Sequence, residues 1–408
     1  MAGFFRGSLL QRTTRDEGRG LPKCGKCGFA KKCFSPRLPV SGSGTSGLIL
    51  VGEAPGEEED RQGSHFVGQG GDRLRDSLKE IGQRYKDCWH TYAMICKPTD
   101  KGFTDVNIES CRPSLLRTID EKKPKVIVLL GAAPARSLLQ AEREASVGSH
   151  DRWVGFSIPS AQHGAWLCPT FSMKEILKSN EDPAMLKLFH QHLRNAYKLV
   201  GKEPRAYTMA ELTAKIERIT SPLAMRKRMR DLAKHKSGIL AFDYEATCLK
   251  PDGSDPRRKL ISVSFCLDGE DTFAGLIDLS NVKTARALSL VLRQEKLLKV
   301  ASNMKFEERW TRAKLGHGVA GWHWDTMLAA HTLDNRKGVT SVKFQAYRYF
   351  GLPDYDKFVD EYKRPKGETD FNTLEDMDSV DLLNYNGLDS LLEFMVMQKQ
   401  RKEMGIIE

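Results

Sequence analysis

The most constraining feature of this chain is a pair of acidic residues, one position apart, inside an apolar segment. Asp243 and Glu245 lie in GILAFDYEAT, whose apolar and aromatic residues are typical of a buried strand. Side chains at positions i and i+2 of a strand point to the same face. Two carboxylates on one face repel each other unless a cation lies between them, so the pattern predicts a divalent-cation site on a sheet. For this pair alone, a solvated strand face is the alternative.

A second pattern near the C-terminus supplies further candidate ligands. Residues 377–404 read as one long helix, on which Tyr385 and Asp389 stand one turn apart. Between the two patterns, a short apolar run ends at Asn303, and a helix with Glu307 near its start is expected to follow.

Two other acids in this region are given structural roles. Asp325 opens the segment WDTMLAAHTLD, and we expect it to cap a helix there. Glu308 competes with its neighbour Glu307 as a ligand, but we expect it to be a solvated charge.

Taken together, these segments resemble the tyrosine-type DEDD 3′–5′ exonucleases, and specifically the proofreading domain of A-family DNA polymerases. The resemblance covers roughly residues 206–408. Its three motifs are carried, in order, by Asp243 and Glu245, by Asn303 and Glu307, and by Tyr385 and Asp389. At Glu307 the family usually has Asp. The resemblance implies an RNase H-like α/β fold and release of nucleoside 5′-monophosphates from single-stranded or frayed DNA ends.

The resemblance also implies two divalent cations, Mg²⁺ or Mn²⁺, because two metal ions can activate water and stabilise both oxygens of a phosphodiester. The side chains expected to hold them are Asp243, Glu245, Glu307 and Asp389. Tyr385 would orient the attacking water. Asn303 and Lys305 would lie near the substrate, although a surface position for Lys305 is the alternative.

Cysteines mark the other end of the chain. Cys24 and Cys27 form a C-x2-C pair, and Cys96 and Cys111 form a C-x14-C pair. From this spacing alone, a structural zinc site and an iron–sulfur cluster are both possible. Cys33 is a spare thiol nearby and an alternative ligand. Because the sequence has no secretory pattern, we expect no disulfide framework among its nine cysteines.

Two strand–loop–helix units, LILVGEAPGEEEDR and VIVLLGAAPARSLL, accompany these cysteines. With the GEAPG loop, the FVG segment and the four cysteines in order, residues 20–200 resemble the family 4 uracil-DNA glycosylases. The resemblance implies an α/β/α domain and a [4Fe–4S] cluster on Cys24, Cys27, Cys96 and Cys111, with zinc as the alternative.

The glycosylase pattern is broken where a base would be excised. Glu53 in GEAPG remains, and Phe66 is expected to stack on a base. The uracil-reading Asn of the family is replaced by Tyr92, and its late His by Ser172. A phenol cannot offer the paired donor and acceptor of an amide, and a hydroxyl cannot replace an imidazole. We therefore expect no uracil excision, with the fold kept for DNA binding or docking.

The predicted organisation is a glycosylase-like domain (20–200), a basic helical linker (201–235) and an exonuclease domain (236–408). The linker contains AMRKRMRDLAKHKSG, which could track a DNA backbone beside the nuclease site or serve only as a connector. A net charge of +11 suits a polyanionic partner. No apolar stretch approaches the roughly 20 residues of a transmembrane helix, so no membrane contact is expected.

We expect an exonuclease that proofreads in trans for a separately encoded polymerase, in the cytoplasm of a bacterium or a phage-infected cell. Two alternatives stay open. One is a DNA-repair glycosylase with altered base specificity fused to a trimming nuclease. The other is a catalytically inactive DNA-binding replisome scaffold.

Overall fold

The computed structural model describes residues 23–143, 146–365 and 370–407. The chain divides into two compact units, and the boundary between them along the sequence lies between residues 206 and 207. Residues 20–22, which begin the predicted first domain, lie outside the described residues. None of the described helices combines the length and the apolar character needed to cross a bilayer.

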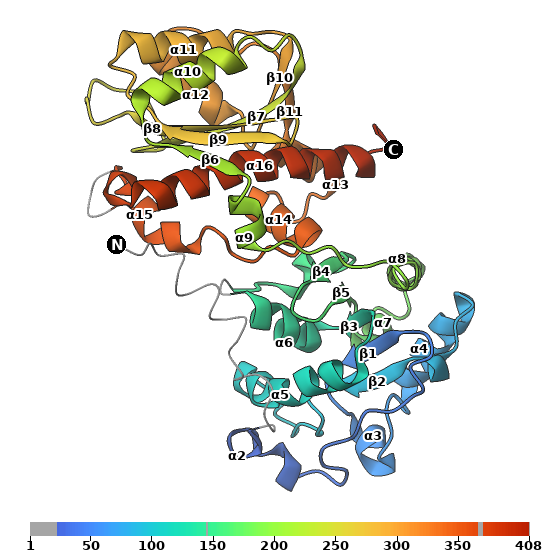
Figure 1. The fold of residues 1–408 in the computed structure, drawn as a ribbon. Coiled ribbons are helices and arrows are strands. Elements are labelled where there is room, and N and C mark those ends of the chain that lie inside the picture. Colours follow the sequence, from blue (N-terminus) through green and yellow to red (C-terminus); the bar gives the residue numbers. More distant parts are fainter. Residues whose placement is uncertain (1–22, 144–145, 366–369, 408) are drawn as a thin grey trace. The chain divides into compact units, whose positions relative to one another are not determined.

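The first unit is built on a five-stranded sheet in the order β2-β1-β3-β5-β4 (Figure 1). Its strands are β1 (Leu48–Gly52), β2 (Trp89–Tyr92), β3 (Val126–Leu130), β4 (Ile158–Ser160) and β5 (Ala165–Thr170). Only β4 runs antiparallel to its neighbour. Strands β1 and β3 are fully buried apolar runs, as expected for parallel strands covered on both faces.

Helices cover both faces of this sheet. They are α2 (Cys24–Cys27), α3 (Glu57–Gln62), α4 (Gln69–Glu80), α5 (Asp105–Lys122), α6 (Ala132–Glu142), α7 (Met173–Lys178) and α8 (Pro183–Tyr197). Helices α4, α7 and α8 share one core with Leu48, Leu50, Val126 and Val128, which point to one face. Ile49 and Ile127, between them, point to the other face and are equally buried.

The second unit is built on a six-stranded sheet in the order β11-β10-β7-β8-β9-β6. Its strands are β6 (Ile216–Ile219), β7 (Gly238–Ala246), β8 (Leu260–Leu267), β9 (Asp271–Leu276), β10 (Leu297–Ala301) and β11 (Trp322–Asp325). Strand β8 alone runs antiparallel to the rest. A β9-β8-β7-β10-β11 order with this one reversed strand is the RNase H-like arrangement that the sequence predicted.

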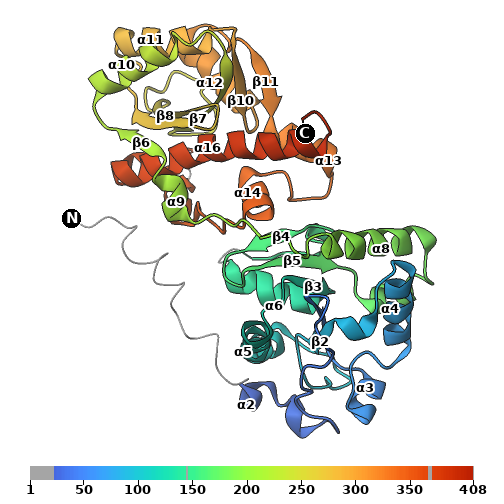
Figure 2. The same cartoon turned by 45° about the vertical axis from the view of Figure 1, so that its right-hand side comes forward.

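Helices again lie on both faces of the sheet. They are α9 (Met209–Thr213), α10 (Pro222–Leu232), α11 (Val282–Leu292), α12 (Lys305–Leu315), α13 (Thr326–Leu333), α14 (Val342–Phe350), α15 (Asp360–Lys363) and α16 (Ser379–Glu403). Figures 1 and 2 show α10, α11 and α12 on one face of the sheet and the long helix α16 crossing the other. The predicted long C-terminal helix is therefore present as α16.

The segment 201–235 differs from the basic linker that the sequence suggested. It contributes β6 to the edge of the second sheet, where β6 pairs with β9. Helix α10 buries Met225, Met229 and Leu232 in the core of this unit. Its basic side chains point away from the core. The buried apolar residues recur at helical spacing between them, and the high charge of the segment made this pattern hard to recognise in the sequence. Because α10 and α16 cover opposite faces, the basic helix does not lie beside the carboxylates described below.

Strand β10 contains a buried lysine that provides a test of this core. Lys299 has no exposed surface, and its ammonium donates to the carbonyl of Gln294. Burial lowers the pKa of Lys299 to about 8. In the unfolded chain the pKa is about 10.4, so below pH 8 both states are charged and the burial cost is fully present.

We therefore expect Lys299→Met to raise the free energy of unfolding at pH 7 by about 1–2 kcal/mol. Between about pH 8 and pH 10.4 the folded wild-type protein loses its proton first, so its stability rises with pH and the advantage of the variant shrinks. Urea unfolding of both proteins at pH 7 and pH 10 measures this. A difference that stays constant with pH would contradict it.

Candidate functional site

Strand β7 positions the first two acids of the candidate site. Phe242 and Tyr244 point into the core beneath α10 and α11. Asp243 and Glu245 alternate with them and therefore point to the opposite face, toward α16. One carboxylate oxygen each from Asp243, Glu245 and Asp389 lie within 4.8 Å of one another.

Helix α16 brings Asp389 to these strand residues and holds them in place. The side-chain amide of Asn386 donates to the Asp243 carboxylate at 2.7 Å and to its backbone carbonyl at 3.2 Å. The Ser262 hydroxyl donates to the Asn386 side chain at 2.9 Å, and the Ser264 hydroxyl donates to its backbone carbonyl at 2.7 Å. These buried bonds tie the helix to β7 and β8 and fix the orientation of Asp243.

Two further buried acids complete the group. Glu307, in the first turn of α12, and Glu393, one turn after Asp389, are each 1% exposed. The backbone N–H of Ser302 donates to Glu393 at 2.9 Å. The Oε2 atoms of both glutamates are buried without a hydrogen-bond partner. Buried carboxylate oxygens without partners are costly, so these atoms fit cation ligands.

The pKa shifts show how crowded these carboxylates are. Burial raises the pKa of Asp243 well above its usual range, and Glu245 and Asp389 raise it further. Burial also raises the pKa of Glu245, and with nearby Asp243 it raises those of Glu307 and Glu393. A divalent cation would reverse this, because it favours the charged form of every carboxylate around it.

Asp389 differs from the other acids because it has cationic partners. Burial alone would raise its pKa, but Lys343 and Lys363 bring the pKa below its usual value. The Lys343 ammonium lies 3.0 and 3.1 Å from the two Asp389 oxygens, and the Tyr355 hydroxyl also donates to Asp389. The Lys363 ammonium donates to the Tyr385 hydroxyl and lies 4.0 Å from Glu245.

The remaining predicted residues of this half lie at the start of α12 and just before it, and at the end of β11. Asn303, at a φ of 63°, and Lys305 are exposed there. Asp325 accepts from the backbone N–H groups of Met327 and Leu328, so its predicted role as a helix cap is confirmed. Asp325 also accepts from the backbone N–H of Asn303 at 3.1 Å, which fixes the turn that precedes Glu307.

Glu308 has a structural role that differs from the predicted solvated charge. It pairs with Arg312 at 2.6 Å, and it accepts from the backbone of Val319 and from the Trp322 indole. Its carboxylate therefore joins α12 to β11, while that of Glu307 is buried near Asp243.

Sequence reasoning missed Glu393, Asn386, Lys343, Lys363 and Tyr355. Glu393 follows Tyr385 and Asp389 at the same four-residue interval, which places all three on one face of α16. That interval could have found Glu393. The two lysines and Tyr355 stand at no fixed sequence interval from Asp389, so only the fold brings them to the site.

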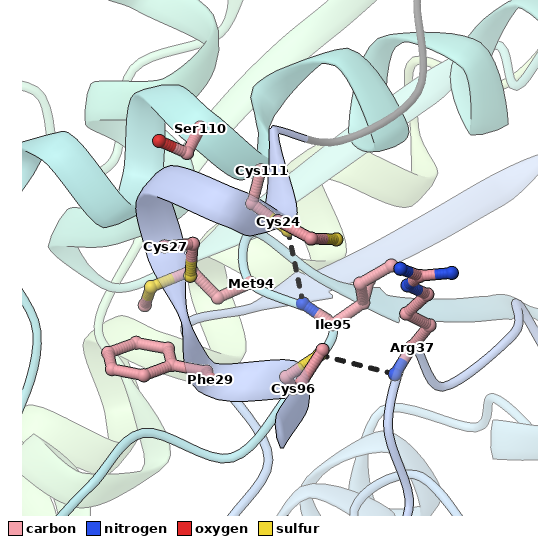
Figure 3. A pocket seen from close by; sticks show the side chains of 10 residues that line it. Cys24, Cys27, Phe29, Arg37, Met94, Ile95, Cys96, Ser110 and Cys111 are labelled. Atoms are coloured by element: carbon pink, nitrogen blue, oxygen red, sulfur yellow. Dashed lines mark hydrogen bonds between the residues drawn. The ribbon is translucent and has the colours of Figure 1, made fainter. Parts of the chain in front are cut away.

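In the first unit, four cysteines surround one pocket (Figure 3). Cys24 and Cys27 belong to α2, Cys96 follows β2, and Cys111 belongs to α5. Cys33, the alternative ligand, lies beside Cys96 but does not line the pocket.

The surroundings of these sulfurs fit thiolates that bind a metal. Backbone N–H groups of Arg37 and Ile95 donate to the sulfurs of Cys96 and Cys111 at 3.2 and 3.5 Å (Figure 3). The Asn107 amide donates to Cys27 at 3.7 Å. Burial raises the pKa of Cys96 to about 12 and that of Cys111 to about 11, so a bound cation is needed to keep them deprotonated.

The expected base pocket is filled by side chains of the protein. Phe66 is only 6% exposed, and its ring packs against that of Tyr92 at 4.8 Å between centroids. The Tyr92 hydroxyl accepts from the Phe66 backbone N–H at 2.8 Å. A Cβ on Gly52 would lie 2.7 Å from the Tyr92 ring, so the tyrosine fills the space over β1. Phe66 thus packs against Tyr92, and its stacking on a base stays a prediction.

Two other residues of this region are engaged locally. Glu53 accepts from the backbone N–H of Ala133 at 3.3 Å, at the start of α6. Ser172 caps α7 by accepting from the backbone of Glu175 at 3.1 Å. Ser172, which stands where the family pattern has a histidine, therefore acts as the N-cap of α7.

Comparison with known proteins identifies the first unit. The model of the uracil DNA glycosylase superfamily matches residues 39–212. Type-4 uracil-DNA glycosylase of Thermotoga maritima is 30% identical over 161 residues, covering 38% of this chain and 79% of that protein. The chain therefore belongs, through its N-terminal part, to the uracil-DNA glycosylase superfamily.

Two further relatives have the same description. Type-4 uracil-DNA glycosylase of Pyrobaculum aerophilum is 33% identical over 121 residues, 29% of this chain and 61% of that protein. That of Archaeoglobus fulgidus is 34% identical over 119 residues, 29% of this chain and 59% of that protein. The chain thus spans about three fifths of the length of these two relatives.

Solved structures similar to this chain include nucleases. Brucella melitensis NrnC bound to pGG has a TM-score of 0.34 and 16% identity, covering 47% of this chain and 81% of that one. Escherichia coli RNase D, an exoribonuclease, has a TM-score of 0.31 and 13% identity, covering 47% of this chain and 45% of that one.

Proposed function

We propose that residues 207–407 form a metal-dependent 3′–5′ DNA exonuclease that acts on single-stranded or frayed ends. The observation that carries this is the group formed by Asp243, Glu245 and Asp389, whose oxygens lie within 4.8 Å of one another. The unpartnered oxygens of Glu307 and Glu393 beside it add to the support. Carboxylates crowded in this number stay charged only when cations lie among them, and phosphodiester hydrolysis is a reaction that such cation sites catalyse.

The expected roles follow from these positions. Asp243, Glu245, Glu307 and Asp389 would hold two Mg²⁺ or Mn²⁺ ions, which supply an activated water and stabilise charge on the phosphate. Asn386 fixes Asp243 through its 2.7 Å bond. Burial raises the pKa of Tyr385 well above its usual range, so its hydroxyl stays protonated and suits orienting a water rather than removing its proton. Asn303 and Lys305 are exposed near Glu307 and would contact the DNA strand that the site cleaves.

For the first unit, we propose DNA binding without uracil excision. Membership of the superfamily favours a DNA-binding surface. Tyr92 fills the space beside Phe66, so a flipped base lacks a place to stack. Glu53 would then face the bound DNA, but no flipped nucleobase would be held beside its carboxylate. Cys24, Cys27, Cys96 and Cys111 would hold a [4Fe–4S] cluster, which would cross-link α2, α5 and the segment after β2.

The biological role we propose is proofreading in trans for a separately encoded replicative polymerase, in a bacterial or phage-infected cell. It rests on the motif resemblance to polymerase proofreading domains and on the net charge of +11, which favours polyanionic partners. The glycosylase with altered specificity and the inactive scaffold are the competing outcomes of the experiment below.

The test uses the full chain and single-stranded DNA labelled at either end. With Mg²⁺ we expect immediate release of a labelled mononucleotide from the 3′ label and a ladder from the 5′ label. EDTA should stop both. In EDTA, a duplex with uracil or hypoxanthine should acquire no abasic sites, because glycosylases need no free divalent metal. Abasic sites would favour the altered glycosylase, and intact DNA in every arm would favour the scaffold.

Neighbouring glutamates supply a matched control for that assay. Glu307→Gln should reduce the rate by about a hundredfold or more, since it removes a charge from the metal site. Glu308→Gln should leave the rate nearly unchanged, because Glu308 joins α12 to β11. Equal effects of the two changes would contradict the assignment of Glu307.

A further inference from the structure

Lys343 is the side chain whose position in the carboxylate group is least explained by the proposed function. It lies in the first turn of α14, and its ammonium bonds both oxygens of Asp389, at 3.0 and 3.1 Å. The ammonium also lies 5.5 Å from the ring centre of Tyr355 and 5.3 Å from that of Tyr385. A lysine thus uses the same oxygens of Asp389 that a metal ion would need.

The charges of the site give Lys343 a second possible position. Five acids, Asp243, Glu245, Glu307, Asp389 and Glu393, face two nearby ammonium groups, those of Lys343 and Lys363, and Asp356 lies near Lys343 as a further acid. Two divalent cations would offset four of the five negative charges. The fifth carboxylate and a bound phosphodiester would then leave two negative charges, equal in number to the two lysines, and Asp356 near Lys343 would add another. A lysine displaced from Asp389 is therefore still needed at the site once substrate binds.

Exposure and flexibility allow that movement. The Lys343 side chain is 29% exposed, whereas that of Asp389 is 6% exposed, so part of the lysine side chain reaches solvent. A lysine side chain is a flexible stem with a compact charge, and it can reach a new partner without moving the backbone. Lys363 has a different arrangement, because its ammonium donates to the Tyr385 hydroxyl.

We propose that Lys343 is a resident cation of the site. It occupies Asp389 until a divalent ion takes that carboxylate, and it then contacts a non-bridging oxygen of the substrate phosphate. This inference rests on the proposed function. It makes Lys343 a competitor of the metal in the free protein and a catalytic residue in the substrate complex.

The two roles predict effects of opposite sign, which a purely structural lysine would not give. In Lys343→Met, Mn²⁺ binding, followed by the loss of the free-ion signal in electron paramagnetic resonance, should tighten about tenfold because the competing cation is gone. At saturating Mn²⁺, kcat on single-stranded DNA should fall about tenfold or more, because a charged contact to the phosphate is lost.

Two variants control the experiment on the full-length protein. Lys343→Arg keeps the charge and should bind Mn²⁺ within about twofold of wild type. Lys399→Met removes an exposed lysine of α16 that lies over Phe350, outside the site, and should change neither quantity. Unchanged or weaker Mn²⁺ binding by Lys343→Met, or an unchanged kcat, would overturn the inference. Failure of wild type itself to bind Mn²⁺ would instead overturn the proposed function.

Discussion

Asp243→Asn is expected to abolish nuclease turnover and, at the same time, to stabilise the metal-free protein. The loss of activity should reach about a thousandfold or more, because the variant removes the carboxylate at the centre of the metal site. The gain in stability has the same cause. Asp243 lies beside Glu245 and Asp389, and burial of its carboxylate together with these neighbouring charges raises its pKa well above the usual range. Without metal, a neutral amide of the same shape relieves that repulsion.

Asp389→Asn is the contrasting change within the same site. It should also abolish turnover, but it should destabilise the metal-free protein by about 1–2 kcal/mol, because it leaves the partly buried ammonium of Lys343 without its partner. Thermal unfolding in EDTA separates the two variants, with Asp243→Asn above wild type and Asp389→Asn below it. Shifts of the same sign would contradict this account of the charges.

Cys111→Ala is expected to remove the metal group from the first unit and to destabilise that unit strongly. Cys111 is buried on α5, and the pocket that it lines joins α5 to α2 and to the segment after β2. Losing a metal cross-link of this kind costs on the order of 5 kcal/mol, since metal-binding energy contributes directly to folding. Iron analysis and visible absorbance should show about four irons per wild-type chain and less than one in the variant.

Two other cysteines make this prediction specific. Cys168 is buried on β5 next to Ser157, away from the pocket, so Cys168→Ala should keep the iron. Cys33→Ala tests the alternative ligand, and this variant should also keep its iron. Iron loss in Cys33→Ala with retention in Cys96→Ala would show that Cys33, not Cys96, is the ligand. One zinc per chain in the wild-type protein would contradict the cluster.

The parts of the fold that the sequence predicted well are those with a strong local signal. The two-residue interval in GILAFDYEAT gave strand β7 and the shared face of Asp243 and Glu245. The uninterrupted pattern around Tyr385 and Asp389 gave helix α16. In both cases periodicity alone decides which side chains share a face.

Other features could not be predicted because they depend on contacts between distant segments. Lys343 reaches Asp389 from α14, and Lys363 reaches Tyr385 from α15, and neither stands at a recognisable interval from its partner. The charge of α10 concealed its buried methionines. The contact of Phe66 with Tyr92, on the neighbouring strand β2, is likewise one that only the packed structure reveals.

The most direct test is anomalous X-ray diffraction from crystals soaked in Mn²⁺, because the central claim is that distant carboxylates of the second unit together bind divalent cations. We predict an anomalous peak in contact with Asp243, Glu245 and Asp389, a second peak between Asp243 and Glu307, and a Lys343 ammonium displaced from Asp389. A map with no peak at these carboxylates at millimolar Mn²⁺, and with Lys343 still bound to Asp389, would contradict the account.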